Sequence, residues 1–315
     1  MTLQCNICKN TKNTTIFRAK EMMYGTHELF EYLHCPQCET LQLYTPVSDM
    51  SVYYPKDYIS FSTQPNYEIY EGLLGYLHKK RDAYPILHEG ISGRLLYKIK
   101  PSLQYSVYDY LNIKREDRIL DVGAGNGRHL RNLNRICGLT NLTGIDPYIE
   151  EDIHFPNGIK LLKRDIFEID GEWDIILFHC SFEHMKHPVK VMKQASSLLK
   201  KGGVCMLVVP ICNTYACIHY KENWVQLDPP RHLYIYSEKS CKLLGEMSGL
   251  HLEYHFYNST AFQFTGSELY KRGIPFCEMN NQHFSKKELR RFRREAEKLN
   301  KEKEGDLAAF YFRKP

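Results

Sequence analysis

The 315-residue sequence contains no apolar run long enough to cross a membrane. Its longest apolar stretches, 173–180 and 203–212, are about ten residues, whereas a spanning helix needs about 20. The N-terminus has neither the basic nor the apolar region of a signal peptide, so we expect a cytoplasmic protein. Internal repeats and low-complexity tracts are also absent from the sequence. With 43% hydrophobic and 25% charged residues, the composition favours an ordinary globular chain.

The net charge is also low, at +5 for the whole chain. Residues 286–304 hold nine Lys or Arg against five Glu, which leaves a net charge of only +1 for all other residues. In that segment, Leu289, Phe292, Ala296 and Leu299 recur at helical spacing and predict an amphipathic helix with a solvated charged face. The low charge elsewhere argues against a nucleic-acid partner, although an RNA-contacting helix is an alternative.

Eleven cysteines are many for a reducing compartment, in which stable disulfides are rare. Two C-x2-C pairs, formed by Cys5, Cys8, Cys35 and Cys38, predict a zinc ribbon with four thiolate ligands. Such a shell leaves no open coordination position, so the zinc is expected to be structural; a redox pair is the alternative. We expect the remaining cysteines to be small buried hydrophobic residues: Cys137, Cys180, Cys205, Cys212, Cys217, Cys241 and Cys277.

Three parts are predicted along the chain. Residues 1–45 form the zinc ribbon, and 46–112 form an aromatic connector with helices on the substrate side. Residues 113–315 form the third part, with a substrate insertion at about 258–305. In the connector, Ile69, Leu73, Tyr76 and Leu77 predict the buried face of one helix, and a second helix is predicted from about 102 to 111.

Short apolar segments alternate with amphipathic helices from Arg118 onward, which predicts crossover connections in a parallel sheet. The fold class is therefore α/β: a Rossmann-like, doubly wound seven-stranded sheet with its last strand reversed, and a small N-terminal zinc-ribbon domain. The expected strands are 118–122, 142–145, 160–162, 174–178, 204–209, 252–257 and 307–312, and the helices between them lie near 128–137, 188–199 and 238–247.

A glycine loop follows the first of these strands, in the segment 119–130. Gly123, Gly125 and Gly127 allow positive φ and close approach of a ligand to the backbone. Dinucleotide sites have the spacing G-x-G-x-x-G, whereas this loop has G-x-G-x-G, and Asp121 places a negative charge where a pyrophosphate would lie. The loop therefore favours a nucleoside-type ligand with a positive charge over a phosphate.

Carboxylates also follow the next two strands. Asp146 is placed to accept both hydroxyls of a ribose. Asp165 is placed to accept an adenine amino proton, with Ile166 stacking on the ring. Each carboxylate alone has an alternative reading as a helix N-cap or a solubilising loop residue. Their succession, each directly after a strand, favours a nucleoside pocket.

With these motifs, the sequence resembles the class I S-adenosylmethionine-dependent methyltransferases over about residues 100–260. It is more narrowly similar to bacterial members that carry an N-terminal zinc ribbon, many of which are linked to methylation of sugars in surface polysaccharides or secondary metabolites. The general resemblance rests on the glycine loop, 144–146, 164–165, 182–184 and 198–203. The narrower one rests on the cysteine pairs, 53–55, Trp224, 228–233 and 266–270.

The resemblance implies a set of cofactor contacts. Asp121 would lie near the methionine ammonium, Asp146 would hold the ribose, and Asp165 with Ile166 would flank the adenine. The residues implied to shape the loop around the methionine part are Gly123, Ala124, Gly125 and Gly127, and His179 at the end of the fourth strand is a further candidate contact.

Methyl transfer to a hydroxyl needs a base, and histidine suits neutral pH. His184 and His232 are the candidates, with Glu183 orienting a histidine or binding sugar hydroxyls; a structural histidine is the alternative for His184. Arg231 is a candidate for binding an anionic group of the acceptor. Tyr53, Tyr54 and Tyr58 are candidates for a lid over the acceptor, with packing between domains as the alternative.

We therefore expect methyl transfer to a hydroxyl of a sugar, a sugar nucleotide or a similar polar small molecule. An RNA methyltransferase is one alternative. Another is a non-catalytic protein that binds a partner through its ribbon.

Overall fold

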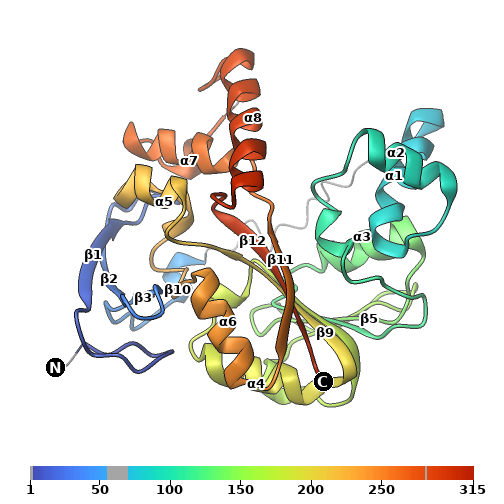
Figure 1. Cartoon of the computed structure of the whole chain (residues 1–315), viewed down its shortest axis with the longest axis horizontal. Coiled ribbons are helices and arrows are strands. Elements are labelled where there is room, and N and C mark those ends of the chain that lie inside the picture. The colour runs from blue at the N-terminus through green and yellow to red at the C-terminus, as the bar shows by residue number, and fades with distance from the viewer. Residues whose placement is uncertain (1–2, 55–69, 281) are drawn as a thin grey trace.

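The computed structural model describes residues 3–54, 70–280 and 282–315. Its centre is an eight-stranded sheet in the order β11-β12-β9-β8-β4-β5-β7-β6 (Figure 1). The strands are β4 (Ile119–Val122), β5 (Leu142–Ile145), β6 (Ile153–His154), β7 (Lys160–Leu162), β8 (Trp173–His179), β9 (Leu199–Pro210), β11 (His251–Tyr257) and β12 (Leu307–Arg313).

This sheet confirms the predicted fold class. Strands β9, β8, β4, β5 and β7 are parallel, and β12 runs antiparallel between β9 and β11. All seven expected strands are present, and the two-residue strand β6 is added at one edge. The buried run from Val204 to Val209 in β9 reflects a strand covered on both faces, which is typical of parallel sheets.

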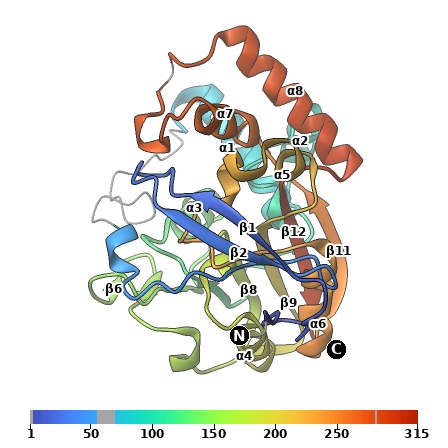
Figure 2. The same ribbon diagram turned by 90° about the vertical axis from the view of Figure 1, so that its left-hand side faces the viewer.

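Helices cover both faces of the sheet (Figure 1). On one side lie α1 (Gly72–Leu87), α2 (Ile91–Ile99) and α3 (Arg128–Cys137), and on the other lie α4 (Pro188–Leu198) and α6 (Glu238–Met247). Helices α5 (Tyr215–Tyr220), α7 (Phe262–Lys271) and α8 (Lys286–Glu302) form a separate group next to the ribbon (Figure 2). Helices α3, α4, α6 and α8 occur where the sequence predicted them. Within the described residues, no helix is both long enough and apolar enough to cross a bilayer.

Two predictions for the connector were wrong. The segment 102–111 contains only a 3-10 turn, Ser106–Tyr108, because its aromatic and β-branched residues are weak helix formers and Tyr105 and Tyr108 are both buried. In α1, Leu73 and Tyr76 are exposed, and the buried residues are Gly75, Asp82, Pro85 and Ile86. Ile69 and Tyr58 lie outside the described residues.

The N-terminal ribbon is built from β1 (Thr15–Lys20), β2 (Leu29–His34) and β3 (Leu41–Leu43), and its sheet is completed by β10 (Tyr234–Ile235). Tyr234 of β10 is in register with Gln42, and the Tyr32 hydroxyl donates to the His232 carbonyl oxygen at 2.8 Å. Because β10 comes from the third part of the chain, the ribbon is joined to the segment that follows β9 by backbone pairing and buried packing.

Candidate active site

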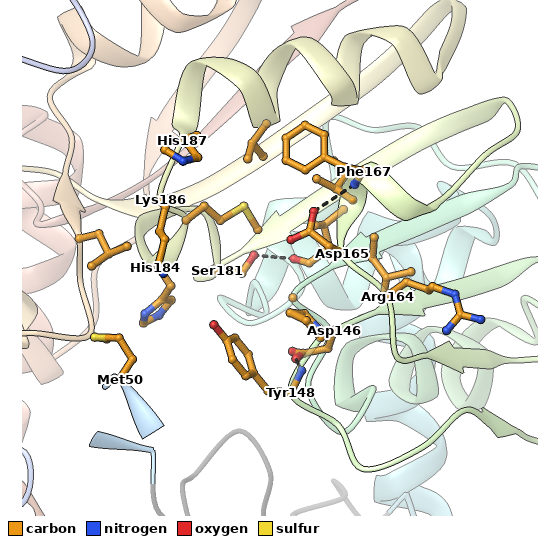
Figure 3. A pocket seen from close by; sticks show the side chains of 18 of the residues that line it. Met50, Asp146, Tyr148, Arg164, Asp165, Phe167, Ser181, His184, Lys186 and His187 are labelled. Carbon is orange, nitrogen blue, oxygen red and sulfur yellow. Dashed lines mark hydrogen bonds between the residues drawn. The ribbon is translucent and has the colours of Figure 1, made fainter. Parts of the chain in front are cut away.

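A cavity of about 500 Å³ opens at the carboxyl ends of β4, β5, β7 and β8 (Figure 3). Val122, Asp146, Asp165 and Cys180, which end or follow these four strands, all line it. The successive carboxylates expected from the sequence therefore meet at one edge of the sheet, as the parallel topology requires.

Asp146 joins the glycine loop to the cavity. One carboxylate oxygen, Oδ2, accepts the backbone N–H of Gly125 at 2.9 Å, and Oδ1 accepts that of Tyr148 at 2.9 Å. Burial raises the pKa of this carboxyl, although both hydrogen bonds oppose that shift. Gly123 has φ +75°, and a Cβ there would lie 2.5 Å from the Cβ of Ser181, so only glycine fits this turn.

Asp165 and Ile166 line the same cavity. Asp165 is also the N-cap of a 3-10 turn: its Oδ1 accepts the N–H of Phe167 at 3.0 Å, and its own N–H donates to Glu168 at 2.8 Å. Asp165 can therefore be both an N-cap and a ligand contact, because the cap hydrogen bonds fix its side chain while it faces the cavity (Figure 3).

Asp121 is buried beneath the glycine loop. Its Oδ2 has no hydrogen-bond partner among the described residues. Burial, and secondly the charge of Asp146, raise the pKa of Asp121 to about 7. A carboxylate in this state gains from a positively charged neighbour more than an exposed one would.

His184 lines the cavity from the loop after β8. Its Nδ1 lies 2.9 Å from the carbonyl oxygen of Arg231 and 3.1 Å from the hydroxyl of Tyr54. Because a carbonyl only accepts, Nδ1 carries the hydrogen and Nε2 keeps a free lone pair. Burial, and secondly the neighbouring His232, lower the pKa of His184 to about 3, so the ring is neutral at physiological pH.

His232 and Glu183 lie behind His184. The two imidazole rings meet edge to face, with centroids 4.8 Å apart. His232 Nδ1 is fixed by the carbonyl oxygen of Gln226 at 2.7 Å, and its Nε2 is 4.0 Å from Glu183 Oε1. Burial raises the pKa of Glu183 to about 8, and its Oε2 has no partner within the described part of the chain.

The expectation that Arg231 binds an anionic group of the acceptor needs correction. The guanidinium is fully buried, pairs with Glu21 at 2.6 Å and with Asp228, and donates to the backbone oxygen of Tyr53 at 3.3 Å. Its positive charge is thus paired with buried carboxylates of the protein itself and does not face an acceptor in the cavity. Tyr53 is also turned away from the cavity: it is buried against Phe30, and its hydroxyl donates to Glu28.

The other residues that were predicted to contact the cofactor or the acceptor differ in whether they line the cavity. Tyr54 lines it and stacks on Tyr148 with ring centroids 6.0 Å apart. His179 instead packs on His129 of α3 with ring centroids 4.0 Å apart, outside the cavity lining. In the glycine loop, Gly123 lines the cavity; Gly125 acts by holding Asp146, while Gly127 and Ala124 pack against Leu161 and Gly144.

Several residues of the cavity lining were not predicted from the sequence. Tyr148 follows Asp146 by two positions, and Lys186 and His187 follow His184 in the same loop. Their proximity in sequence to predicted residues was the available signal. No sequence signal pointed to Met50, because this residue reaches the cavity only through the packing of the connector (Figure 3).

The four ribbon cysteines form a second cluster. Cys5 Sγ is 3.5 Å from Cys38 Sγ, and Cys8 Sγ is 3.5 Å from Cys35 Sγ, so each contact joins the two C-x2-C turns. All four sulfurs lie within 4.8 Å of one another. This arrangement is compatible with a tetrahedral metal site, in which bonds of about 2.3 Å separate the sulfurs by about 3.8 Å.

The expectation that the other seven cysteines are buried was wrong for two of them. Cys180 and Cys277 are exposed, because Cys180 follows β8 at the cavity and Cys277 lies in a short 3-10 turn. Cys217 is half-buried, and the remaining four are buried as expected: Cys137, Cys205, Cys212 and Cys241.

Several solved methyltransferase structures resemble this chain at low sequence identity. A chain from the complex between the Haloferax volcanii Trm112 methyltransferase activator and a putative methyltransferase is 14% identical, with a TM-score of 0.47, and the match covers 75% of this chain and 97% of that chain. A putative sarcosine dimethylglycine methyltransferase of Galdieria sulphuraria is 17% identical, with a TM-score of 0.43 and coverage of 75% and 98%. A putative methyltransferase of Bacillus halodurans is 14% identical, with a TM-score of 0.44 and coverage of 68% and 99%.

None of the curated proteins matches the chain. The family described as "Methyltransferase domain" matches residues 96–255, which is half of the sequence and contains the glycine loop, all the carboxylates of the cavity and both histidines. The chain therefore belongs to the S-adenosylmethionine-dependent methyltransferases and is an enzyme of that family.

Proposed function

We propose that the enzyme methylates a hydroxyl group of a sugar, a sugar nucleotide or a similar polar small molecule. One observation carries this proposal: His184 lines the cavity of the nucleoside-type carboxylates, with its Nδ1 hydrogen-bonded to the Arg231 carbonyl and its Nε2 left as the proton acceptor. A hydroxyl nucleophile needs such an acceptor, whereas a neutral amine can attack before it loses its proton.

The described residues fit S-adenosylmethionine. Asp146 and Asp165 offer acceptors in a cavity of about 500 Å³. Asp121 lies outside the cavity lining, and its buried, unpartnered Oδ2 places negative charge beneath the glycine loop, which suits a positively charged ligand group above it. When bound, the cofactor supplies a methyl group already activated by a sulfonium. The chain's task is then to align the acceptor, exclude water and take up one proton at His184 Nε2.

In the same proposal, Cys5, Cys8, Cys35 and Cys38 hold one structural zinc ion. His232 and Glu183 act as positioning residues, because they contact His184 or each other and lie outside the cavity lining. Arg231 has a similar role, since its backbone oxygen fixes the tautomer of His184 while its guanidinium is anchored to Glu21 of the ribbon.

Replacing Asp146 with alanine is expected to weaken S-adenosylmethionine binding by about 100-fold, because two charge-assisted hydrogen bonds of about 1.5 kcal/mol each are lost. Isothermal titration calorimetry measures this. Asp152→Ala is a matched control: Asp152 also accepts a backbone N–H, from Lys163 at 2.7 Å, but lies outside the cavity lining. Equal affinities of the two variants would mean that the ribose lies elsewhere.

Cofactor affinity is also expected to depend on pH through Asp121. Its raised pKa of about 7 means that the free enzyme holds a proton there at lower pH, and a cationic ligand must displace it. Affinity should therefore rise, by roughly tenfold, between about pH 5.5 and 7, with proton release on binding. Calorimetry in buffers of different ionisation enthalpy measures both effects. In Asp121→Asn both should disappear; a pH-dependence retained by this variant would assign the proton to another group.

The acceptor itself is tested by mass spectrometry. The enzyme is incubated with methyl-labelled S-adenosylmethionine and the sugar-nucleotide pool of the producing cells, and products carrying the labelled methyl group are sought. In parallel, surface glycans are compared with and without the gene, for one missing methyl group. Labelled RNA instead of a labelled sugar would contradict the proposal.

A further inference from the structure

Among the described residues, the most exposed apolar side chains gather on the helical hairpin formed by α1 and α2. On α2, Ile91 is 81% exposed, Leu95 57% and Ile99 82%. These residues are four apart, so they form one stripe along the helix. On α1, Leu73 is 75% and Leu74 72% exposed. The hairpin lies at the end of the molecule opposite the ribbon, where it projects beyond α3 (Figure 1).

The two helices of the hairpin pack closely. A Cβ on Gly93 of α2 would lie 2.6 Å from the carbonyl oxygen of Lys80 in α1, so the two helices pack with their backbones close together. The buried face of α2 is thus used against α1, and the apolar stripe is on the face that remains open. Apolar exposure on this scale marks an interaction surface.

Basic residues border the stripe. By helical spacing, Arg94 and Lys98 lie beside Ile91 and Leu95 on the open face, and both are exposed. Neither forms a salt bridge within the described parts of the chain. Residues 72–100 carry six Lys or Arg against two acidic residues, a net of +4 that equals the net charge of residues 286–304.

We propose that the α1–α2 hairpin, residues 72–100, docks the enzyme on the surface of an anionic lipid bilayer. An apolar stripe bordered by Lys and Arg is suited to insertion at the level of the headgroups, where lipid phosphates match the basic residues. A second copy of the chain would bring two hairpins of +4 together, so like charges oppose that occupant. RNA is disfavoured because the stripe consists of aliphatic residues and offers no aromatic platform for bases.

The test is co-flotation of the full-length, zinc-replete enzyme with lipid vesicles. We expect binding to vesicles of phosphatidylcholine with about 30% phosphatidylglycerol that is at least about tenfold tighter than to phosphatidylcholine alone, and that is lost in about 0.5 M salt. The variant Ile91→Ser/Leu95→Ser/Ile99→Ser and the variant Arg94→Glu/Lys98→Glu should each reduce binding about tenfold or more. Retained S-adenosylmethionine binding shows that each variant is folded.

Helix α8 supplies the matched control. It is as basic as the hairpin, but its apolar residues Phe292, Ala296 and Leu299 are buried. Arg293→Glu/Arg294→Glu should leave vesicle binding unchanged. Equal losses from α8 and α2 variants, equal binding to neutral vesicles, or no binding at all would overturn the proposal. So would a dimer that the serine variant converts to a monomer, or RNA binding that the Arg94→Glu/Lys98→Glu variant abolishes.

Discussion

Replacing His184 with alanine is expected to lower kcat by about 100- to 10,000-fold while leaving the affinity for S-adenosylmethionine nearly unchanged. The residue lines the cavity, and its Nδ1–H is directed to the carbonyl oxygen of Arg231, so only Nε2 is available to take the proton of an acceptor hydroxyl. The proposed ribose and adenine acceptors, Asp146 and Asp165, come from other loops and keep their own backbone hydrogen bonds. Steady-state kinetics with the identified acceptor and calorimetry with the cofactor measure the two effects.

His187→Ala is the matched control, because His187 also lines the cavity but is exposed and follows the turn that holds His184. His232→Ala should lower kcat by a smaller factor, since His232 acts through its edge-to-face contact with His184. Full activity of His184→Ala would remove it from the reaction.

The pH profile separates His184 from its neighbour Glu183. With a pKa lowered to about 3, His184 is neutral across the physiological range, so kcat/KM should show no ionisation of this group between about pH 5 and 8. If Glu183 were the base, its raised pKa of about 8 would make the rate climb about tenfold per unit toward that pH. The Glu183→Gln variant would then lose the climb together with the activity.

Removing zinc is the second large expected effect. We expect about one zinc ion per chain, and we expect Cys35→Ser to lose the metal, unfold the ribbon and abolish turnover, because binding of a structural zinc contributes about 10 kcal/mol or more to folding of such sites. Elemental analysis, thermal unfolding and the methyl-transfer assay measure these outcomes.

The loss of activity has a physical route. Glu21, between β1 and β2, accepts the N–H groups of Tyr24 and Thr26 and holds the guanidinium of Arg231 at 2.6 Å. The backbone oxygen of Arg231 in turn fixes His184. Unfolding the ribbon would leave the buried charge of Arg231 without Glu21. The Arg231 carbonyl would then no longer hold His184 in the tautomer with hydrogen on Nδ1.

Cys277→Ser is the control for zinc removal, because Cys277 is exposed and lies outside the cluster. A protein that is purified without metal and with the ribbon cysteines oxidised in pairs would contradict the zinc proposal and favour the redox alternative. Intact mass before and after reduction distinguishes these two states.

Much of this protein was predictable from sequence, because local patterns carried it. The period of apolar residues located the strands of the central sheet, and the succession of Asp146 and Asp165 after parallel strands placed both carboxylates at one edge. The paired cysteine spacing likewise predicted a cluster that the fold brings together. The sequence by itself thus determined the fold class, the two carboxylates that meet in the cavity and the family.

Only the tertiary structure decided how the residues around His184 are arranged. Arg231 is polar and follows two prolines in a loop, which is the usual setting of a substrate contact, yet Glu21, 210 positions earlier, buries its charge. The orientation of His184 in the cavity depends on the backbone carbonyl of Arg231, 47 positions later, whereas His232, behind it, is held by the nearby carbonyl of Gln226. The exposure of the apolar stripe on α2 was also not predictable, because apolar spacing does not say which face of a helix is buried. For Arg231 and His184 the deciding partner is remote in sequence, and a one-dimensional pattern reports only on neighbours along the chain.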